Sequence, residues 1–138
     1  MAYCMCYALT TPSCREIFVR CVFMSDCIFC KIARHEIGSN IVYEDDEIIA
    51  FKDLSPQAPV HVLVIPKTHI SGLLELTGNA PQVVGRIVSE IVPRLARELG
   101  IADGGFRVVV NTGEDGGQTV GHLHFHLLGG RSMTWPPG

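Results

Sequence analysis

Apolar positions recur along this chain in two patterns, one typical of β-strands and one typical of an amphipathic helix. Short alternating or β-branched runs predict strands over 41–43, 48–51, 60–65, 106–111 and 122–128. A broad apolar stripe over 83–99 predicts a long helix that begins near Asn79 or Ala80 and ends before Gly100. Mostly antiparallel strands beside one long helix indicate an α+β fold.

Two local features refine the helices. Pro93 lies inside the apolar stripe and removes one helical hydrogen bond at a cost of about 3 kcal/mol. We expect it to kink the last two turns rather than abolish them. A short helix is predicted over about 27–35, with Asp26 as its cap.

Residues 1–23 share neither the periodicity nor the charge pattern of the rest. We therefore expect one domain over 24–138, preceded by an N-terminal extension over 1–23 that is disordered or a gene-model artefact. A mitochondrial presequence is the alternative, because Arg15 and Arg20 are basic and Glu16 is the only acid in that stretch. Serine and arginine are sparse for such a presequence.

Charge and cysteine content narrow the class of protein. The formal net charge of the 138 residues is −3, with no run of five like charges, which argues against nucleic-acid and membrane partners. No apolar run reaches the roughly 18 residues that a membrane span needs. The 6 cysteines lack a regular framework spacing and no secretory signal is evident, so we expect a reducing, cytoplasmic setting.

Three histidines occupy every second position of the last predicted strand. Because successive side chains of a strand point to opposite faces, His122, His124 and His126 line one face and the intervening apolar residues line the other. A polar strand face would also place histidines there. One zinc ion cannot bind all three, since the outer two lie about 13 to 14 Å apart along a strand and a Zn–N bond is far shorter.

Anion chemistry fits this row of histidines better. Imidazole can be a nucleophile, a proton carrier and, when charged, a phosphate partner. The preceding glycine-rich segment offers backbone N–H groups to an oxyanion, together with side-chain donors on Asn111 and Thr119. His124 is the best flanked of the three for attack on phosphorus, so we predict it to be the nucleophile.

Three segments make the chain resemble the histidine-triad (HIT) family, whose signature is His-φ-His-φ-His-φ-φ with φ apolar. They are 122–130, 53–59 and 135–138, and they are similar to the branch called histidine-triad nucleotide-binding proteins. The resemblance extends from about Asp26 to Gly138. It implies a five-stranded antiparallel sheet that pairs with a second subunit into a ten-stranded sheet, and hence a homodimer.

The resemblance also implies a purine nucleotide site. His124 would become transiently nucleotidylated, and His61 would complete the hydrogen-bond chain of the histidines. Phosphate contacts would come from Asn111, Gly117, Thr119 and His126. Thr119 stands where relatives often have serine, and its hydroxyl could pass a proton to a leaving amine. Asp53 would bind the ribose hydroxyls. The purine base would lie against residues that periodicity alone makes ordinary core positions, namely Ile28, Phe29, Ile32 and Phe51.

The pair Cys27 and Cys30 has three interpretations: buried thiols, a redox pair or half of a zinc site. Zinc-containing relatives imply that His69 and His122 complete a Cys2His2 site. Such a zinc would be structural, because four protein ligands leave no position for substrate. His122 would then brace its neighbours, and the chemistry itself would need no cofactor.

The resemblance therefore implies a hydrolase that cleaves the P–N bond of purine nucleoside phosphoramidates and releases the nucleoside monophosphate. The family's typical substrates are adenosine 5′-phosphoramidate and aminoacyl adenylates. One alternative is a dinucleoside polyphosphate hydrolase, although that branch usually has proline and arginine where this chain has Gly129 and Gly130. The others are a nucleotide-binding regulatory protein with vestigial catalysis and a hydrolase that uses zinc-activated water.

Overall fold

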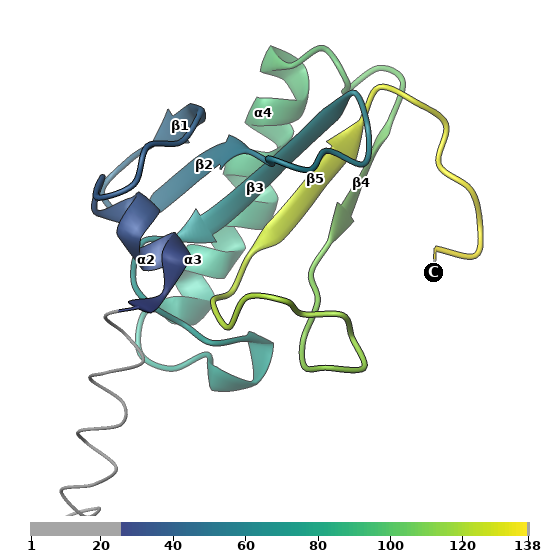
Figure 1. The fold of residues 1–138 in the computed structure, drawn as a ribbon. Helices are drawn as coiled ribbons and strands as arrows, with labels where there is room; N and C mark the ends of the chain where they lie inside the picture. The colour runs from purple at the N-terminus through teal and green to yellow at the C-terminus, as the bar shows by residue number, and fades with distance from the viewer. Residues whose placement is uncertain (1–25, 138) are drawn as a thin grey trace, which may run out of the picture.

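A five-stranded antiparallel sheet with strand order β1-β2-β3-β5-β4 forms the centre of the protein. The computed structural model describes residues 26–137 (Figure 1). Its strands are β1 (Ile41–Glu44), β2 (Ile48–Lys52), β3 (Val60–Pro66), β4 (Phe106–Val109) and β5 (Phe125–Gly129). The predicted α+β class and five-stranded sheet are confirmed, whereas residues 1–23 lie outside the described part of the chain.

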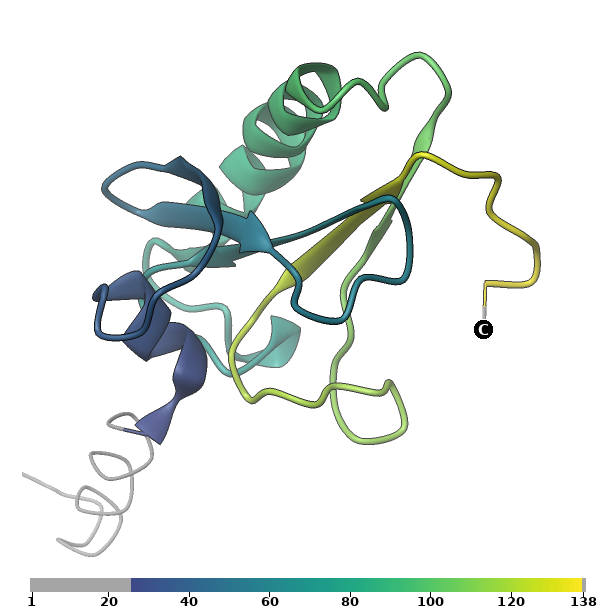
Figure 2. The ribbon, with the colours of Figure 1, turned by 45° about the horizontal axis from the view of Figure 1, so that its top comes forward.

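The helices lie on opposite faces of the sheet. The short helix α2 (Ile28–Ala33) covers one face, and the long helix covers the other (Figure 2). The long helix consists of α3 (Ala80–Arg86), a π-helical turn η2 (Ile87–Ile91) and α4 (Val92–Glu98), and a 3-10 turn η1 (Leu73–Glu75) precedes it. Within 26–137, none of these helices has the length and apolar character needed to cross a membrane.

Alternating side chains of the central strands divide the interior into two cores. On the long-helix side, Ile48 and Ala50 of β2 pack with Ile87 and Leu95. On the α2 side, the neighbouring residues of β2 pack with residues of α2 and β3, a set consisting of Phe29, Ile32, Ile49, Phe51, Leu63 and Ile65. This alternation follows from the two-residue period of a strand.

Pro93 is accommodated by the π-helical turn that precedes it. The backbone N–H of Val92 donates to the carbonyl of Ile87, a bond that spans five residues instead of four. Because proline has no N–H to donate, a local shift in hydrogen-bond pattern lets the helix continue past it. The helical stretch therefore runs on to Glu98, as the apolar stripe predicts.

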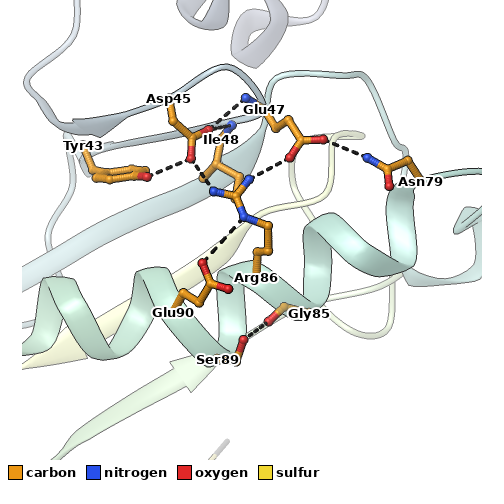
Figure 3. A network of polar contacts seen from close by, with 9 residues as sticks. All are labelled: Tyr43, Asp45, Glu47, Ile48, Asn79, Gly85, Arg86, Ser89 and Glu90. Atoms are coloured by element: carbon orange, nitrogen blue, oxygen red, sulfur yellow. Dashed lines mark hydrogen bonds and ion pairs between the residues drawn. The ribbon is translucent and has the colours of Figure 1, made fainter.

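Arg86 ties the long helix to the turn between β1 and β2 (Figure 3). Its guanidinium group lies 2.8 Å from Asp45 and 2.7 Å from Glu47, and 3.7 Å from Glu90 on its own helix. Asp45 also accepts hydrogen bonds from Tyr43 and from two backbone amides. These bonds hold the pKa of Asp45 near 2 despite its partial burial.

Two local predictions were wrong. Cys27, and not Asp26, is the N-cap of α2, without a side-chain capping bond, while the Asp26 carboxylate lies 3.4 Å from the Lys31 ammonium group. Strand β5 begins at Phe125, so His122 and His124 precede it. The reason for the second difference is that the Leu123 N–H donates to the carbonyl of Ile70, outside the sheet, at 2.6 Å.

Candidate functional site

The three histidines keep their alternation although only His126 lies within β5. The apolar residues between and after them all belong to the core under the long helix, namely Leu123, Phe125 and Leu127. The imidazoles face the other side, where they pack edge to face with the Phe29 ring of α2. The ring centroid of Phe29 lies 5.9 Å from that of His122 and 5.2 Å from that of His124. The sequence-based assignment of the two faces is therefore confirmed.

His124 is held in one orientation by the residue two positions before it. Its Nδ1 lies 2.6 Å from the backbone carbonyl of His122, and a carbonyl can only accept, so Nδ1 carries the hydrogen. When this ring acts as a nucleophile, its lone pair must therefore be the one on Nε2. The residue is 4% exposed, with the rings of Phe29 and His126 packed against it.

His126 and His61 form a directed hydrogen-bond chain with the backbone of Gln57. The Gln57 N–H donates to Nδ1 of His61 at 3.1 Å, so the hydrogen of neutral His61 must be on Nε2. That Nε2 lies 2.9 Å from Nδ1 of His126, to which it donates. His126 then presents an Nε2–H. Gln57 was missed at the sequence level, because a backbone amide leaves no trace in side-chain chemistry.

Burial keeps this pair of imidazoles neutral near pH 7. It lowers the pKa of His126 to about 4, helped by the neighbouring imidazoles of His124 and His61. Burial also lowers the pKa of His61, while the Asp53 carboxylate acts in the opposite direction. Neutral rings have one donor and one acceptor nitrogen each, which the directed chain requires.

Asp53 lies beside the hydrogen bond between His61 and His126. Its Oδ1 accepts a hydrogen bond from the Ser55 backbone N–H at 2.7 Å, and its Oδ2 lies 3.4 Å from Nε2 of His61. Asp53, His61 and His126 are close enough to suggest a metal site. However, the 2.9 Å between Nε2 of His61 and Nδ1 of His126 is a hydrogen-bond length. Two nitrogen ligands of a tetrahedral zinc ion would lie about 3.3 Å apart.

The glycine-rich segment forms a loop beside this row. Gly117 has a φ of 74°, a left-handed conformation that favours glycine, and its carbonyl accepts a 3.4 Å hydrogen bond from the Asn111 side chain. Gln118 anchors the loop by donating to the Ser71 carbonyl at 2.6 Å, a contact that no sequence pattern predicts. Thr119 lies with Ile28 and His69 in the wall of a pocket of about 380 Å³.

The four residues predicted to surround a purine base fall into two groups. Ile28 is 46% exposed and lines the pocket with Thr119. The other three are buried in the core under α2, namely Phe29, Ile32 and Phe51. Their contacts support the core interpretation of these three side chains, and a purine contact stays a prediction.

A second cluster lies at the His122 end of the histidine row and consists of Cys27, Cys30, His69 and His122. Nδ1 of His122 lies 3.4 Å from Sγ of Cys27 and 3.5 Å from Sγ of Cys30, and Nδ1 of His69 lies 3.3 Å from Sγ of Cys30. A tetrahedral zinc with ordinary bond lengths separates its sulfur and nitrogen ligands by about 3.6 Å. The predicted Cys2His2 set is therefore compatible with a structural zinc ion.

The surroundings of His122 fit the same role. Its Nε2 donates to the Pro66 carbonyl at 2.8 Å, which leaves Nδ1 unprotonated toward the sulfurs, as a ligating imidazole requires. Burial lowers the pKa of His122 to about 4 and so keeps the ring neutral. Without a metal, burial and the neighbouring Cys27 raise the pKa of the Cys30 thiol to about 11. Zinc would supply the charge that stabilises its thiolate.

The antiparallel sheet and its alternating histidines define a histidine-triad protein. The HIT domain matches residues 34–133, and the chain belongs to the HIT family. Among solved structures it is similar to a HIT family hydrolase from Legionella pneumophila, with 46% identity and a TM-score of 0.79, covering 82% of this chain and 100% of the other. A histidine triad protein from Clostridium difficile is 48% identical, with a TM-score of 0.75, over 79% and 94%.

Similar relatives come from cyanobacteria and plants. An uncharacterized HIT-like protein of Synechococcus elongatus is 55% identical over 82% of this chain and 97% of its own length. A 14 kDa zinc-binding protein of Brassica juncea is 46% identical over 82% of this chain and its full length. The zinc binding named for the plant protein agrees with the Cys2His2 cluster seen here.

Proposed function

We propose that this HIT protein hydrolyses the P–N bond of purine nucleoside phosphoramidates through a nucleotidyl intermediate on His124. The observation that carries the proposal is the 2.6 Å bond from Nδ1 of His124 to the His122 carbonyl. It commits the ring hydrogen to Nδ1, which leaves the Nε2 lone pair for attack. Because only 4% of the residue is exposed, substrate phosphate must reach His124 through this small accessible area.

The reaction has two displacements at phosphorus. In the first, Nε2 of His124 bonds to phosphorus while the P–N bond to the amine breaks, and the amine leaves with a proton passed from solvent through the Thr119 hydroxyl. In the second, water bonds to phosphorus, the bond to His124 breaks, and the water proton returns to solvent. The products are the amine and the nucleoside monophosphate, and the free imidazole is restored.

Charge on the phosphate oxygens is met by neutral donors. The Nε2–H of His126 points its hydrogen away from His61 because Nδ1 already accepts. Asn111 and Thr119 supply side-chain donors from the glycine-rich loop, whereas the Gly117 N–H already donates to the Glu114 carbonyl at 2.9 Å. Asp53 takes the ribose hydroxyls. Such pre-set donors stabilise charge that develops in the transition state.

A homodimer is part of the proposal. Strand β4 is one edge of the sheet, and Phe106 and Val108 on it are 39% and 40% exposed. An unpaired edge with apolar side chains favours pairing with another strand. A second copy meeting β4 would extend the sheet to ten strands.

Rapid-quench intact mass measurement with adenosine 5′-phosphoramidate tests the chemistry. We expect a nucleotidyl adduct that maps to His124 and disappears in His124→Ala. His35→Ala is the matched control, because His35 is exposed and its side chain, among residues 26–137, pairs only with Glu44. Phosphoramidate hydrolysis that proceeds equally fast in His124→Ala would refute the nucleophile. Faster turnover of a diadenosine polyphosphate would favour the other hydrolase branch, and activity that needs zinc but not His124 would favour metal-activated water.

A further inference from the structure

The loop that carries Gln57 is held from outside the histidine row. Arg131, in the turn after β5, donates from Nε and Nη2 to the Gln57 carbonyl at 3.2 and 3.1 Å. The Gln57 carbonyl therefore accepts two hydrogen bonds from the same guanidinium group. The amide of the same Gln57 faces Nδ1 of His61. Arg131 and His61 are thus joined through a single residue.

The turn after β5 is shaped for this contact. Gly130 has a φ of 86°, a conformation that L side chains rarely adopt, and its backbone approaches Pro59. A Cβ added at Gly130 would lie 2.9 Å from Cβ of Pro59, closer than atoms can pack. Gly130 therefore packs against Pro59 while Arg131 bonds to Gln57, so the turn after β5 contacts both ends of the segment 57–59.

We propose that Arg131 is a positioning residue that holds the Gln57 amide on His61 and so sets the direction of the His61–His126 hydrogen bond. This role rests on the proposed function, in which His126 must present an Nε2–H to phosphate. Arg131 acts only through the loop, since its bonds within residues 26–137 are to the carbonyls of Gln57 and Ser132.

The direction of the chain depends on the amide for a simple reason. An N–H facing Nδ1 of His61 excludes the tautomer with a hydrogen on Nδ1, because two hydrogens would then meet. Without the amide, no contact within residues 26–137 excludes a hydrogen on Nδ1 of His61, and only the Asp53 carboxylate, 3.4 Å from Nε2, still favours a hydrogen on the other nitrogen. In the reversed form His126 would donate to His61 from Nδ1, and its Nε2 would face phosphate as a lone pair. Repulsion would then replace attraction at the reacting group.

The Asp53 carboxylate does not replace the amide. Its Oδ2 is 3.4 Å from Nε2 of His61, whereas Nδ1 of His126 is 2.9 Å from the same nitrogen. Asp53 also acts on the nitrogen opposite the one that the amide contacts. Fixing Nδ1 of His61 as an acceptor is left to Gln57, and fixing Gln57 is left to Arg131.

The test compares Arg131→Ala, Arg131→Lys and Arg107→Ala in the full chain. Arg107 is a matched control, because its guanidinium group also donates to a carbonyl of the C-terminal segment, that of Thr134, at 2.6 Å. Imidazole nitrogen NMR on 15N-histidine-labelled protein reports directly which nitrogens of His61 and His126 carry hydrogen. Steady-state hydrolysis of adenosine 5′-phosphoramidate gives kcat and KM separately.

We expect wild type and Arg107→Ala to keep His61 protonated on Nε2. Arg131→Ala should give a mixture of tautomers and a kcat lower by about 3- to 10-fold, the range that one or two modest hydrogen bonds correspond to, with KM little changed. Arg131→Lys, which keeps a charged donor group but not the fork that makes both bonds to the Gln57 carbonyl, should recover part of the loss. Unchanged tautomers in a folded Arg131→Ala protein, or an equal effect of Arg107→Ala, would overturn the proposal.

The NMR readout separates this proposal from the proposed function. A wild-type protein without phosphoramidase activity would refute that function. If its His61 tautomer still depended on Arg131, the positioning role would stand. Urea unfolding of each variant shows whether a mixture of His61 tautomers results from a destabilised fold. If Arg131→Ala is destabilised, Arg131→Lys is compared with wild type instead.

Discussion

His122 and His124 are joined by a hydrogen bond of 2.6 Å from the imidazole of one to the backbone carbonyl of the other. The side chain of His122 meanwhile contacts both sulfurs of the Cys2His2 cluster and the Pro66 carbonyl. The group that orients the proposed nucleophile is therefore part of the same residue that belongs to the candidate zinc site. Metal occupancy and the orientation of His124 are expected to change together.

Zinc removal should lower both stability and activity. At a free zinc concentration 100 times the Kd, a metal bound only by the folded state contributes about 2.7 kcal/mol, which a strong chelator would remove. We expect a lower thermal midpoint, loss of one zinc per chain by elemental analysis and slower phosphoramidate turnover. Cys30→Ser should behave like the chelated wild type and respond little to further chelation. A large chelator effect on that variant would contradict the assignment.

Acid should destabilise the protein through His126. Its pKa in the folded state is about 4, below the ordinary value of 6.5, so the unfolded chain binds the proton more readily between these values. The stability linked to this histidine is present above pH 6.5 and is lost as the pH falls toward 4. Urea midpoints measured from pH 7 to 4 should fall less steeply for His126→Gln than for wild type.

Replacing Arg86 should loosen the long helix from the β1–β2 turn. Arg86→Gln keeps most of the side-chain volume but removes the charge that faces Asp45 and Glu47. We expect a lower urea midpoint, with a difference from wild type that shrinks at high salt because these pairs are partly exposed. A double-mutant cycle with Asp45→Asn should show that the two losses are not additive. Full additivity would mean that the contact contributes nothing.

Gly130→Ala should be costly for its size. The left-handed φ of 86° and the overlap with Pro59 predict a loss of about 1–3 kcal/mol in the free energy of unfolding. Gly104→Ala is the control, because nothing lies within 4 Å of a Cβ added there and its φ is not left-handed. Equal unfolding free energies for the two variants would rule out the close approach.

The sequence predicts side chains whose spacing fixes their direction. The alternation of histidine with apolar residues is enough to assign the two faces at 122–127, and the observed core contacts of Leu123 and Leu127 agree. The Cys27–Cys30 pair is likewise detectable, because its separation of three residues is local. Its partners His69 and His122 come from resemblance, since no local pattern connects residues so far apart in the chain.

The features that the sequence did not predict depend on where backbone N–H and C=O groups point. Gln57 acts through its amide and carbonyl, and the conformation of its loop decides where these point. The start of β5 was misplaced for a similar reason, because a bond from Leu123 to Ile70 replaces sheet pairing. The cap of α2 was misassigned because Asp26 lies beside Lys31 instead.

The two-sided arrangement of 122–127 makes the length of this segment more critical than any one of its apolar side chains. Exchanging Leu127 for another aliphatic residue alters packing only locally. Inserting a single residue between Leu123 and Phe125 would instead turn every following side chain to the other face. An imidazole would then be forced under the long helix and an apolar side chain would take its place in the histidine row, so an insertion here would abolish folding and chemistry in one step.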